Sequence, residues 1–264
     1  VYRGWRRVLD EYPGEKAFVG EIWLQSTERV ARYLRPGELH TAFNFHFLLA
    51  SWSAESLRAA VDASMASMAE VDAPVTWVLS NHDVVRHVTR YGGDDLELGT
   101  HRARAASLMM LALPGSSYLY QGEELGLPEV VDLPDELRQD PTFHRTNGAR
   151  RGRDGARVPL PWAGTEPPFG FGPGPQTWLP QPRSWAALTA EAQEADATST
   201  WAMYQAALSE RHRHPALGDG SMAWLATPPG VLAFRREPGF VCVVNVTDDA
   251  VPVPAGIGGR VLLA

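Results

Sequence analysis

The chain has 264 residues, of which 44% are hydrophobic and 21% are charged. This balance allows a sizeable core and excludes general disorder, collagen-like repeats and a coiled coil. Lysine and arginine number 24 against 31 aspartate and glutamate residues, so the net charge is −7. Because the charge is acidic and no basic stripe is present, we expect no nucleic acid partner.

The cysteine count and the hydropathy argue against disulfide-rich, membrane-spanning and secreted proteins. Cys242 is the single cysteine, which excludes an internal disulfide framework and a cysteine-rich metal site. No apolar run reaches the roughly 18 residues of a membrane helix, and the N-terminus does not resemble a signal peptide. We therefore expect no membrane association and a cytoplasmic location. Since no His, Asp or Glu grouping has metal-ligand spacing, neither a metal nor a cofactor is expected.

Short apolar runs alternate with helical patterns along the first half of the chain. Runs that indicate buried strands occupy residues 16–24, 41–50, 74–80 and 117–120. Apolar residues at helical spacing predict helices over residues 3–12, 54–69 and 100–113. Buried strands that alternate with helices indicate a parallel sheet with right-handed crossovers.

The second half of the chain changes in character. Residues 128–190 are rich in proline, glycine and arginine, and they predict a long functional loop or lid. A helix is predicted over residues 197–212, and from Ser221 short alternating runs broken by Pro-Gly turns indicate an all-β domain. The four predicted βα units are half the number in a TIM barrel, so either half a barrel or a different α/β fold fits the count.

The first candidate for catalysis is Glu21, near the end of the first predicted strand. Its neighbours include Val19, Ile22 and Trp23. Apolar surroundings favour the protonated form of a carboxyl group, which suits a general acid working near neutral pH. The alternative is a structural glutamate paired with an arginine.

A second polar group, Asn81-His82-Asp83, ends the third predicted strand, and Arg86 follows shortly after it. The carboxyl ends of parallel barrel strands meet at one mouth, so Glu21 and Asp83 would face the same cavity. Two carboxylates with a histidine and an arginine suit a polyhydroxylated small molecule. The alternative is a helix cap formed by Asn81 or Asp83.

Two further groups of residues have weaker signals. Phe43, Phe45 and Phe47 predict core packing, although one ring could stack on a sugar. Glu123 and Glu124 follow the fourth predicted strand, where they could lie beside a substrate or in water.

Four runs between residues 17 and 162 resemble glycoside hydrolase family 13, the α-amylase family, in the order FVGEIW, VTWVLSNHDVVRH, SSYLYQGEELGL and GRDGARVPLPW. Their spacing is most similar to the α-glucosidase members, which include maltose- and isomaltose-cleaving enzymes. The resemblance implies an α/β fold: the C-terminal half of a TIM barrel, strands five to eight, over residues 1–218. The start of a C-terminal β-sandwich domain would then occupy residues 219–264.

The resemblance also implies a role for each candidate residue. Glu21 matches the general acid/base at the end of barrel strand five. Asp83, at the end of strand seven, matches the carboxylate that stabilises the transition state. His82 matches a histidine that hydrogen-bonds the glucose beside the scissile bond, and Arg86 matches an arginine of the same subsite. The implied substrates are α-glucosides and oligosaccharides.

One departure from the family pattern concerns the nucleophile. The family places it in a run such as Asp-Gly-Phe-Arg-Ile-Asp on strand four, and no such run occurs in this sequence. A retaining glycosidase needs two carboxyl groups about 5–5.5 Å apart, one as nucleophile and one as acid/base. We therefore expect a C-terminal fragment of a larger enzyme. Because half a barrel has unpaired strand edges, we expect the fragment alone to be poorly soluble or molten and to have no glycosidase activity.

The expected activity of the intact protein is that of a retaining α-glucosidase acting on terminal bonds of malto- or isomalto-oligosaccharides. An alternative within the family is a transglycosylase or isomerase such as trehalose or isomaltulose synthase. A non-enzymatic transporter-associated chain is disfavoured because Glu21 and Asp83 are retained and no membrane segment is present. The sequence does not decide between α-1,4 and α-1,6 linkages.

Overall fold

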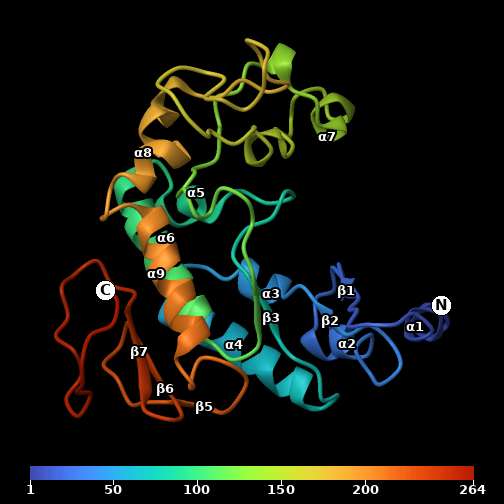
Figure 1. Ribbon diagram of the computed structural model, residues 1–264, viewed down its shortest axis with the longest axis vertical. Helices are drawn as coiled ribbons and strands as arrows, with labels where there is room; N and C mark the ends of the chain where they lie inside the picture. Colours follow the sequence, from blue (N-terminus) through green and yellow to red (C-terminus); the bar gives the residue numbers. More distant parts are fainter. The chain divides into compact units, whose positions relative to one another are not determined.

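The structure is a computed structural model that describes residues 1–264 (Figure 1). The chain divides into two compact units. The first unit comprises residues 1–78, 109–118 and 211–260. The second comprises residues 79–108, 119–210 and 261–264. The division of the chain at residue 218 stays a prediction.

Four short parallel strands form the sheet of the first unit: β1 (Val19–Gly20), β2 (Thr41–Ala42), β3 (Thr76–Val78) and β4 (Ser116–Tyr118). Strand β1 pairs with β2 and β3 pairs with β4, both in parallel. A parallel bridge between Phe43 and Thr76 connects the two pairs. The strands therefore lie side by side in chain order, as consecutive βα units require, and the predicted parallel sheet is confirmed.

The helices that accompany these strands are α1 (Tyr2–Asp10), α2 (Thr27–Ala31), α3 (Phe45–Leu48) and α4 (Ala54–Ala69). Helix α4 has the predicted bounds, and the Ser53 hydroxyl caps it by accepting from the Ser56 N–H. The predicted strand over residues 41–50 is wrong beyond Ala42. The Asn44 side chain accepts a hydrogen bond from the Phe47 N–H, and this cap starts α3.

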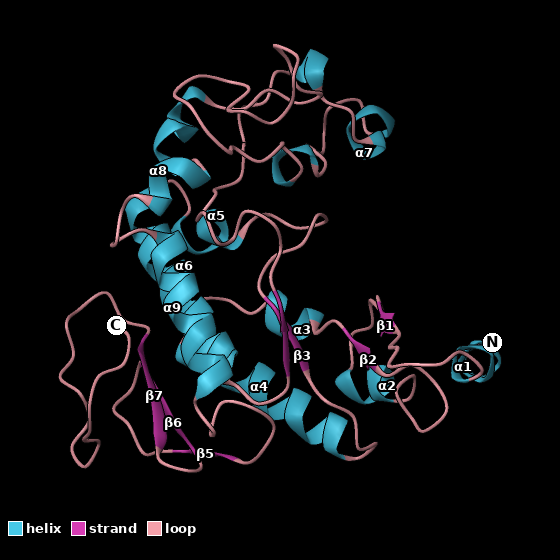
Figure 2. Ribbon diagram, viewed as in Figure 1, coloured by secondary structure: helices cyan, strands magenta, loops and turns pink.

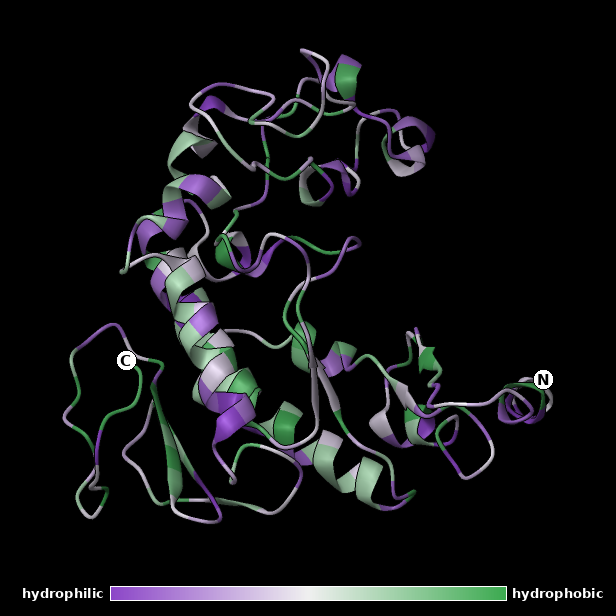
Figure 3. Ribbon diagram, viewed as in Figure 1, coloured by the Kyte–Doolittle hydropathy of each residue, from purple (hydrophilic) through white to green (hydrophobic).

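An antiparallel sheet follows in the first unit, with strands β5 (Met222–Trp224), β6 (Val231–Arg236) and β7 (Phe240–Asn245) in that order. This confirms the predicted short alternating strands, and β6 and β7 are coloured mainly as hydrophobic in Figure 3. The Arg236 side chain is fully buried and donates to the carbonyl oxygens of Ser221, Ala112 and Gly218. The β-sandwich domain itself stays a prediction.

The remaining helices are α5 (His87–Gly92), α6 (Leu96–Ala112), α7 (Pro141–Arg145), α8 (Ala190–Glu194) and α9 (Thr200–Arg213). Helix α6 begins four residues before the predicted start, and α9 lies close to its predicted range. None of the helices has both the length and the apolar composition that crossing a bilayer requires.

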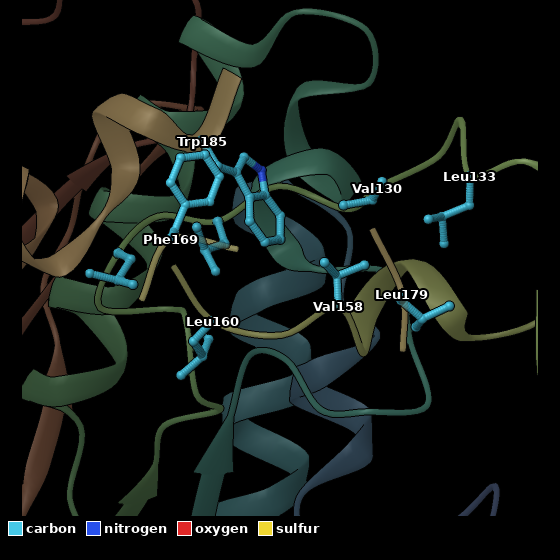
Figure 4. Packing of buried hydrophobic residues seen from close by; sticks show 9 residues of the cluster. Val130, Leu133, Val158, Leu160, Phe169, Leu179 and Trp185 are labelled. Atoms are coloured by element: carbon cyan, nitrogen blue, oxygen red, sulfur yellow. The ribbon is translucent and has the colours of Figure 1, made fainter. Parts of the chain in front are cut away.

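Residues 128–190 are mostly irregular, as predicted (Figure 2). Besides α7 they contain three 3-10 turns, Asp135–Leu137, Asp154–Ala156 and Arg183–Leu188. The segment nevertheless has its own hydrophobic core, in which Trp185 and Phe169 pack with Val158 and Leu160 (Figure 4). Burying large apolar side chains fixes an irregular backbone, so this segment can hold polar groups in defined positions.

Candidate active site

Glu21 is the first residue after β1, and its side chain is exposed. The Trp23 indole N–H donates to Oε1 of Glu21 over 3.4 Å. The prediction that Glu21 has apolar surroundings is wrong. Strand β1 ends at Gly20, and the residues that follow it lie near the surface of the first unit. Glu21 is accessible to solvent and to a ligand.

The indole of Trp23 lies beside this carboxylate and stacks on Phe45. The two ring centroids are 3.8 Å apart and the ring planes differ by 10°. Phe45 is buried, whereas 46% of Trp23 is exposed. Of the phenylalanines predicted as core, Phe45 and Phe47 are buried, and Phe43 packs edge-on against Tyr118. The aromatic face left open next to Glu21 therefore belongs to Trp23.

Asp83 belongs to the second unit and lies five residues beyond the end of β3. Its backbone N–H donates to Oδ1 of Asn81 over 2.8 Å, as does the N–H of Val84 over 3.1 Å. The alternative of a helix cap by Asn81 or Asp83 is wrong, because the N-cap position of α5 is Arg86 and no side chain caps that helix; Asn81 makes a local turn instead. The turn fixes the backbone of Asp83 and leaves its carboxylate for other partners.

Two arginines that are distant in sequence converge on one oxygen of this carboxylate. Oδ1 of Asp83 accepts from Nη1 of Arg153 over 2.9 Å and from Nη2 of Arg157 over 2.8 Å. Nε2 of His82 lies 3.5 Å from the same oxygen. The Asp83 side chain is 21% exposed, and its Oδ2 has no hydrogen bond within the protein. Oδ1 of the carboxylate is therefore held by the two arginines, whereas Oδ2 takes no part in these contacts.

His82 is the most accessible member of this group, with 53% of its side chain exposed. Its backbone carbonyl accepts from Nε of Arg157 over 2.8 Å. Arg157 therefore holds both the backbone of His82 and the side chain of Asp83, and so fixes the orientation of this turn.

Arg86 has a different environment from the one that a sugar-binding residue needs. It is 1% exposed, and its guanidinium donates to the carbonyl oxygens of Gln121 and Ala156, each over 3.0 Å. It also lies over the Tyr120 ring, 4.7 Å from the centroid. A direct bond to a sugar would require the guanidinium to leave these partners, so the structure favours a packing role over the expected sugar contact.

The sequence reasoning missed Arg153, Arg157 and Asp140. Asp140 has a fully buried side chain, and it accepts from the backbone N–H and from Nε of Arg153 over 2.9 and 2.6 Å. The hydrogen bonds from Arg153 hold the pKa of Asp140 well below its usual range. The run GRDGARVPLPW was identified as a motif, and its two arginines were the available signal.

Glu21 and Asp83 belong to different compact units. That the two carboxylates meet in one cavity stays a prediction, as do the roles assigned to Glu21, Asp83, His82 and Arg86.

A family model and several known proteins are similar to this chain. The model of the alpha amylase catalytic domain matches residues 1–220. A probable alpha-glucosidase of Rhizobium meliloti is 34% identical over 251 residues, which are 93% of this chain and 44% of that protein. A glucan 1,6-alpha-glucosidase of Streptococcus dysgalactiae is 28% identical and matches 88% of this chain and 49% of its own length. The chain thus spans about half the length of these curated relatives.

The fold is also similar to that of solved structures. The alpha-glucosyl transfer enzyme XgtA superposes with a TM-score of 0.86 at 37% identity, over 97% of this chain and 48% of XgtA. The trehalulose synthase MutB superposes with a TM-score of 0.82 at 24% identity, over 97% of this chain and 52% of its own, and supports the fold alone. The family match extends over most of the chain and includes both carboxylate motifs. The chain therefore belongs to the alpha-amylase family, through its catalytic domain.

Proposed function

We propose that this chain forms part of a retaining α-glucosidase, in which Glu21 is the general acid/base. The observation that carries the proposal is the membership in the alpha-amylase family together with carboxylates at both motif positions, Glu21 and Asp83. In the first step Glu21 protonates the glycosidic oxygen as the bond to the anomeric carbon breaks. In the second step the same carboxylate takes a proton from the water that releases glucose.

Asp83 and His82 bind the glucosyl ring in this proposal. The open Oδ2 of Asp83 accepts hydrogen bonds from sugar hydroxyls, and the negative charge of Asp83 stabilises the positive charge that develops on the ring. The exposed ring of His82 donates to a hydroxyl on the same side. Arg86 does not contact the sugar in this proposal. Its buried guanidinium stabilises the backbone beside Asp83 by donating to two carbonyl groups.

The nucleophile of this reaction is an aspartate that residues 1–264 do not supply in the family's usual run. In the proposed mechanism it comes from a segment outside these residues and attacks the anomeric carbon while Glu21 protonates the leaving group. A retaining mechanism requires these two carboxyl groups to lie about 5–5.5 Å apart.

A second candidate function is transfer of the glucosyl group to another sugar. The similarity to XgtA, an alpha-glucosyl transfer enzyme that is 37% identical to this chain, favours it. Both functions use the same carboxylates and differ in whether water or a sugar hydroxyl attacks the glucosyl intermediate.

Product analysis separates the two functions. The full-length product of the gene that carries this sequence is incubated with maltose, isomaltose or sucrose, and the sugars are followed by chromatography. Hydrolysis of maltose or isomaltose gives two glucose molecules per bond cleaved and no new sugar, whereas transfer gives one glucose, the leaving group, per bond cleaved together with a new oligosaccharide. No conversion of any of these sugars would contradict the proposed function. The variant Glu15→Gln, which changes an exposed carboxylate just before β1, is the control for Glu21→Gln.

A further inference from the structure

A chain of charged side chains extends from Asp83 into the interior of the second unit. Nη1 of Arg153 donates to Oδ1 of Asp83 over 2.9 Å, and Nε of the same guanidinium donates to Oδ2 of Asp140 over 2.6 Å. The remaining nitrogen, Nη2, lies 3.5 Å from Oδ1 of Asp140. One planar guanidinium thus connects an accessible carboxylate with a buried one.

The buried end of this chain is rigidly held. The Asp140 side chain is 0% exposed and accepts from the backbone N–H groups of Thr142 and Arg153 over 2.7 and 2.9 Å. Asp154 fixes the backbone beneath it by accepting from the N–H groups of Gln139 and Asp140, each over 3.0 Å. A buried carboxylate with this many donors is ionised and has one orientation.

We infer that Asp140 is a positioning residue, which fixes the guanidinium of Arg153 so that Asp83 presents Oδ2 to the sugar. This inference rests on the proposed function of Asp83. Arginine is always charged and its donors have a fixed planar geometry, so anchoring Nε determines the direction in which Nη1 points. Arg157 binds the same Oδ1, and together the two arginines hold Asp83 in one rotamer.

Asp140 affects catalysis through the balance of charge in the group formed by Asp83, Asp140, Arg153 and Arg157. Two arginines face two carboxylates, Asp83 and Asp140, so the four charges balance. If Asp140 loses its charge, Arg153, like Arg157, has only Asp83 as an acidic partner within this group. The negative charge of Asp83 is then more fully neutralised by its neighbours and stabilises the positive charge on the glucosyl ring less well.

The test is Asp140→Asn in the full-length gene product, assayed for α-glucoside turnover. Asparagine has nearly the same shape, but its NH2 group replaces one accepting oxygen, so the variant removes the charge together with the hydrogen bonds that this oxygen accepts. We expect kcat to fall about 10- to 100-fold because a positioned group near the reacting atoms is displaced. We expect KM to change less than about threefold, since the lost interaction strengthens in the transition state.

The matched control is Asp135→Asn. Asp135 also pairs with arginines of the same segment, Arg138 and Arg151, but its side chain is 68% exposed. We expect its kcat to equal that of the unmodified protein. If Asp140→Asn also kept the kcat of the unmodified protein, the positioning role would be wrong while the proposed function would stand.

A double-mutant cycle keeps the test decisive if Asp140→Asn also lowers stability. Lysine at position 153 keeps the charge but cannot contact both carboxylates in the same way. We expect the double variant Asp140→Asn/Arg153→Lys to be no slower than Arg153→Lys alone, because Asp140 acts through Arg153. Additive losses of kcat would contradict the inference. Full turnover by Asp83→Asn would overturn the proposed function, and the positioning role with it.

Discussion

The Tyr204 hydroxyl lies 3.3 Å from Oε2 of Glu123 in the buried interior of the second unit. The same hydroxyl donates its single proton to Oγ of Ser107 over 2.7 Å, because Ser107 donates its own proton to the carbonyl oxygen of Ala103. Tyr204 therefore has no proton left for Glu123, so Glu123 must be the donor. A carboxyl group that donates is protonated, and burial correspondingly raises the pKa of Glu123 to about 8.

This protonated state makes the stability of the second unit depend on pH. The pKa of Glu123 rises from 4.5 to about 8 on folding, so the folded state binds more protons than the unfolded state between these values. The free energy of unfolding therefore decreases as the pH rises from about 4.5 to about 8.

The variant Glu123→Gln tests this dependence. The glutamine amide can donate to Tyr204 and its oxygen can accept from the Tyr120 N–H, which replaces both contacts of the carboxyl group. We expect the variant to be more stable than the unmodified protein by about 1–3 kcal/mol above pH 8, and of similar stability near pH 5. Denaturant unfolding of the full-length gene product at both pH values measures the difference. Equal stability of the two proteins at both pH values would show that Glu123 is not protonated on folding.

His87 gives a pH dependence of the opposite sign. Burial, with the positive charges of Arg90 and Arg86 nearby, lowers the pKa of His87 from 6.5 to about 3. The folded state keeps the ring neutral while the unfolded state binds a proton, so stability decreases as the pH falls from about 6.5 to about 3. The backbone N–H of His87 donates to the Ser80 hydroxyl over 3.0 Å, and the same hydroxyl is hydrogen-bonded to Nδ1 of the ring over 2.8 Å. The variant His87→Asn keeps an acceptor there, and we expect a shallower loss of stability over this range in acid denaturation.

The buried Arg236 holds the antiparallel sheet to the residues before β4. Its guanidinium donates to three carbonyl groups, and the buried one of these, that of Ala112, would be left unpaired in Arg236→Met. We expect this variant to lower the free energy of unfolding by about 3 kcal/mol or more, since bonds to a charged donor are worth about 1.5–3 kcal/mol each. Arg235→Met, which changes the exposed neighbour in β6, is the control. Equal denaturation midpoints of the two variants would contradict the assigned role.

The buried position of Arg86 also has a measurable consequence. Lysine cannot donate to the carbonyl oxygens of both Gln121 and Ala156 with the same geometry. We expect Arg86→Lys to lower stability by about 1–3 kcal/mol and to lower kcat as the Asp83 turn loosens. A variant with unchanged stability but a raised KM would instead indicate that Arg86 contacts the sugar directly.

Elements with a long apolar stripe were predictable from the sequence, and single turns were not. The pattern of Leu57, Val61 and Met68 places α4 correctly, because a helix of several turns repeats its apolar face. Phe45 and Phe47 alternate as in a strand, yet they lie in α3, a single turn that the Asn44 cap starts. One helical turn is too short for its period to be distinguished from that of a strand.

Candidate site residues could be proposed from the sequence where they follow a predicted strand. Glu21 directly follows β1 and Asp83 lies five residues after β3, whereas Asp140 lies in an irregular segment without periodicity. The burial of Arg86 depends on carbonyl groups that are 35 and 70 residues away in the chain, so its neighbours in sequence do not reveal it. Likewise, the exposure of Glu21 depends on the early end of β1, which the apolar run does not indicate.

The central claim is that Glu21 is the acid/base, and the variant Glu21→Gln in the full-length gene product tests it most directly. Two substrates are compared: maltose, whose leaving group needs a proton, and α-glucosyl fluoride, whose leaving group needs much less acid assistance. We expect the first step with maltose to slow by about 10²–10⁴-fold and the corresponding step with the fluoride to slow far less. Undiminished turnover of maltose by Glu21→Gln, measured beside Glu15→Gln, would contradict the assignment.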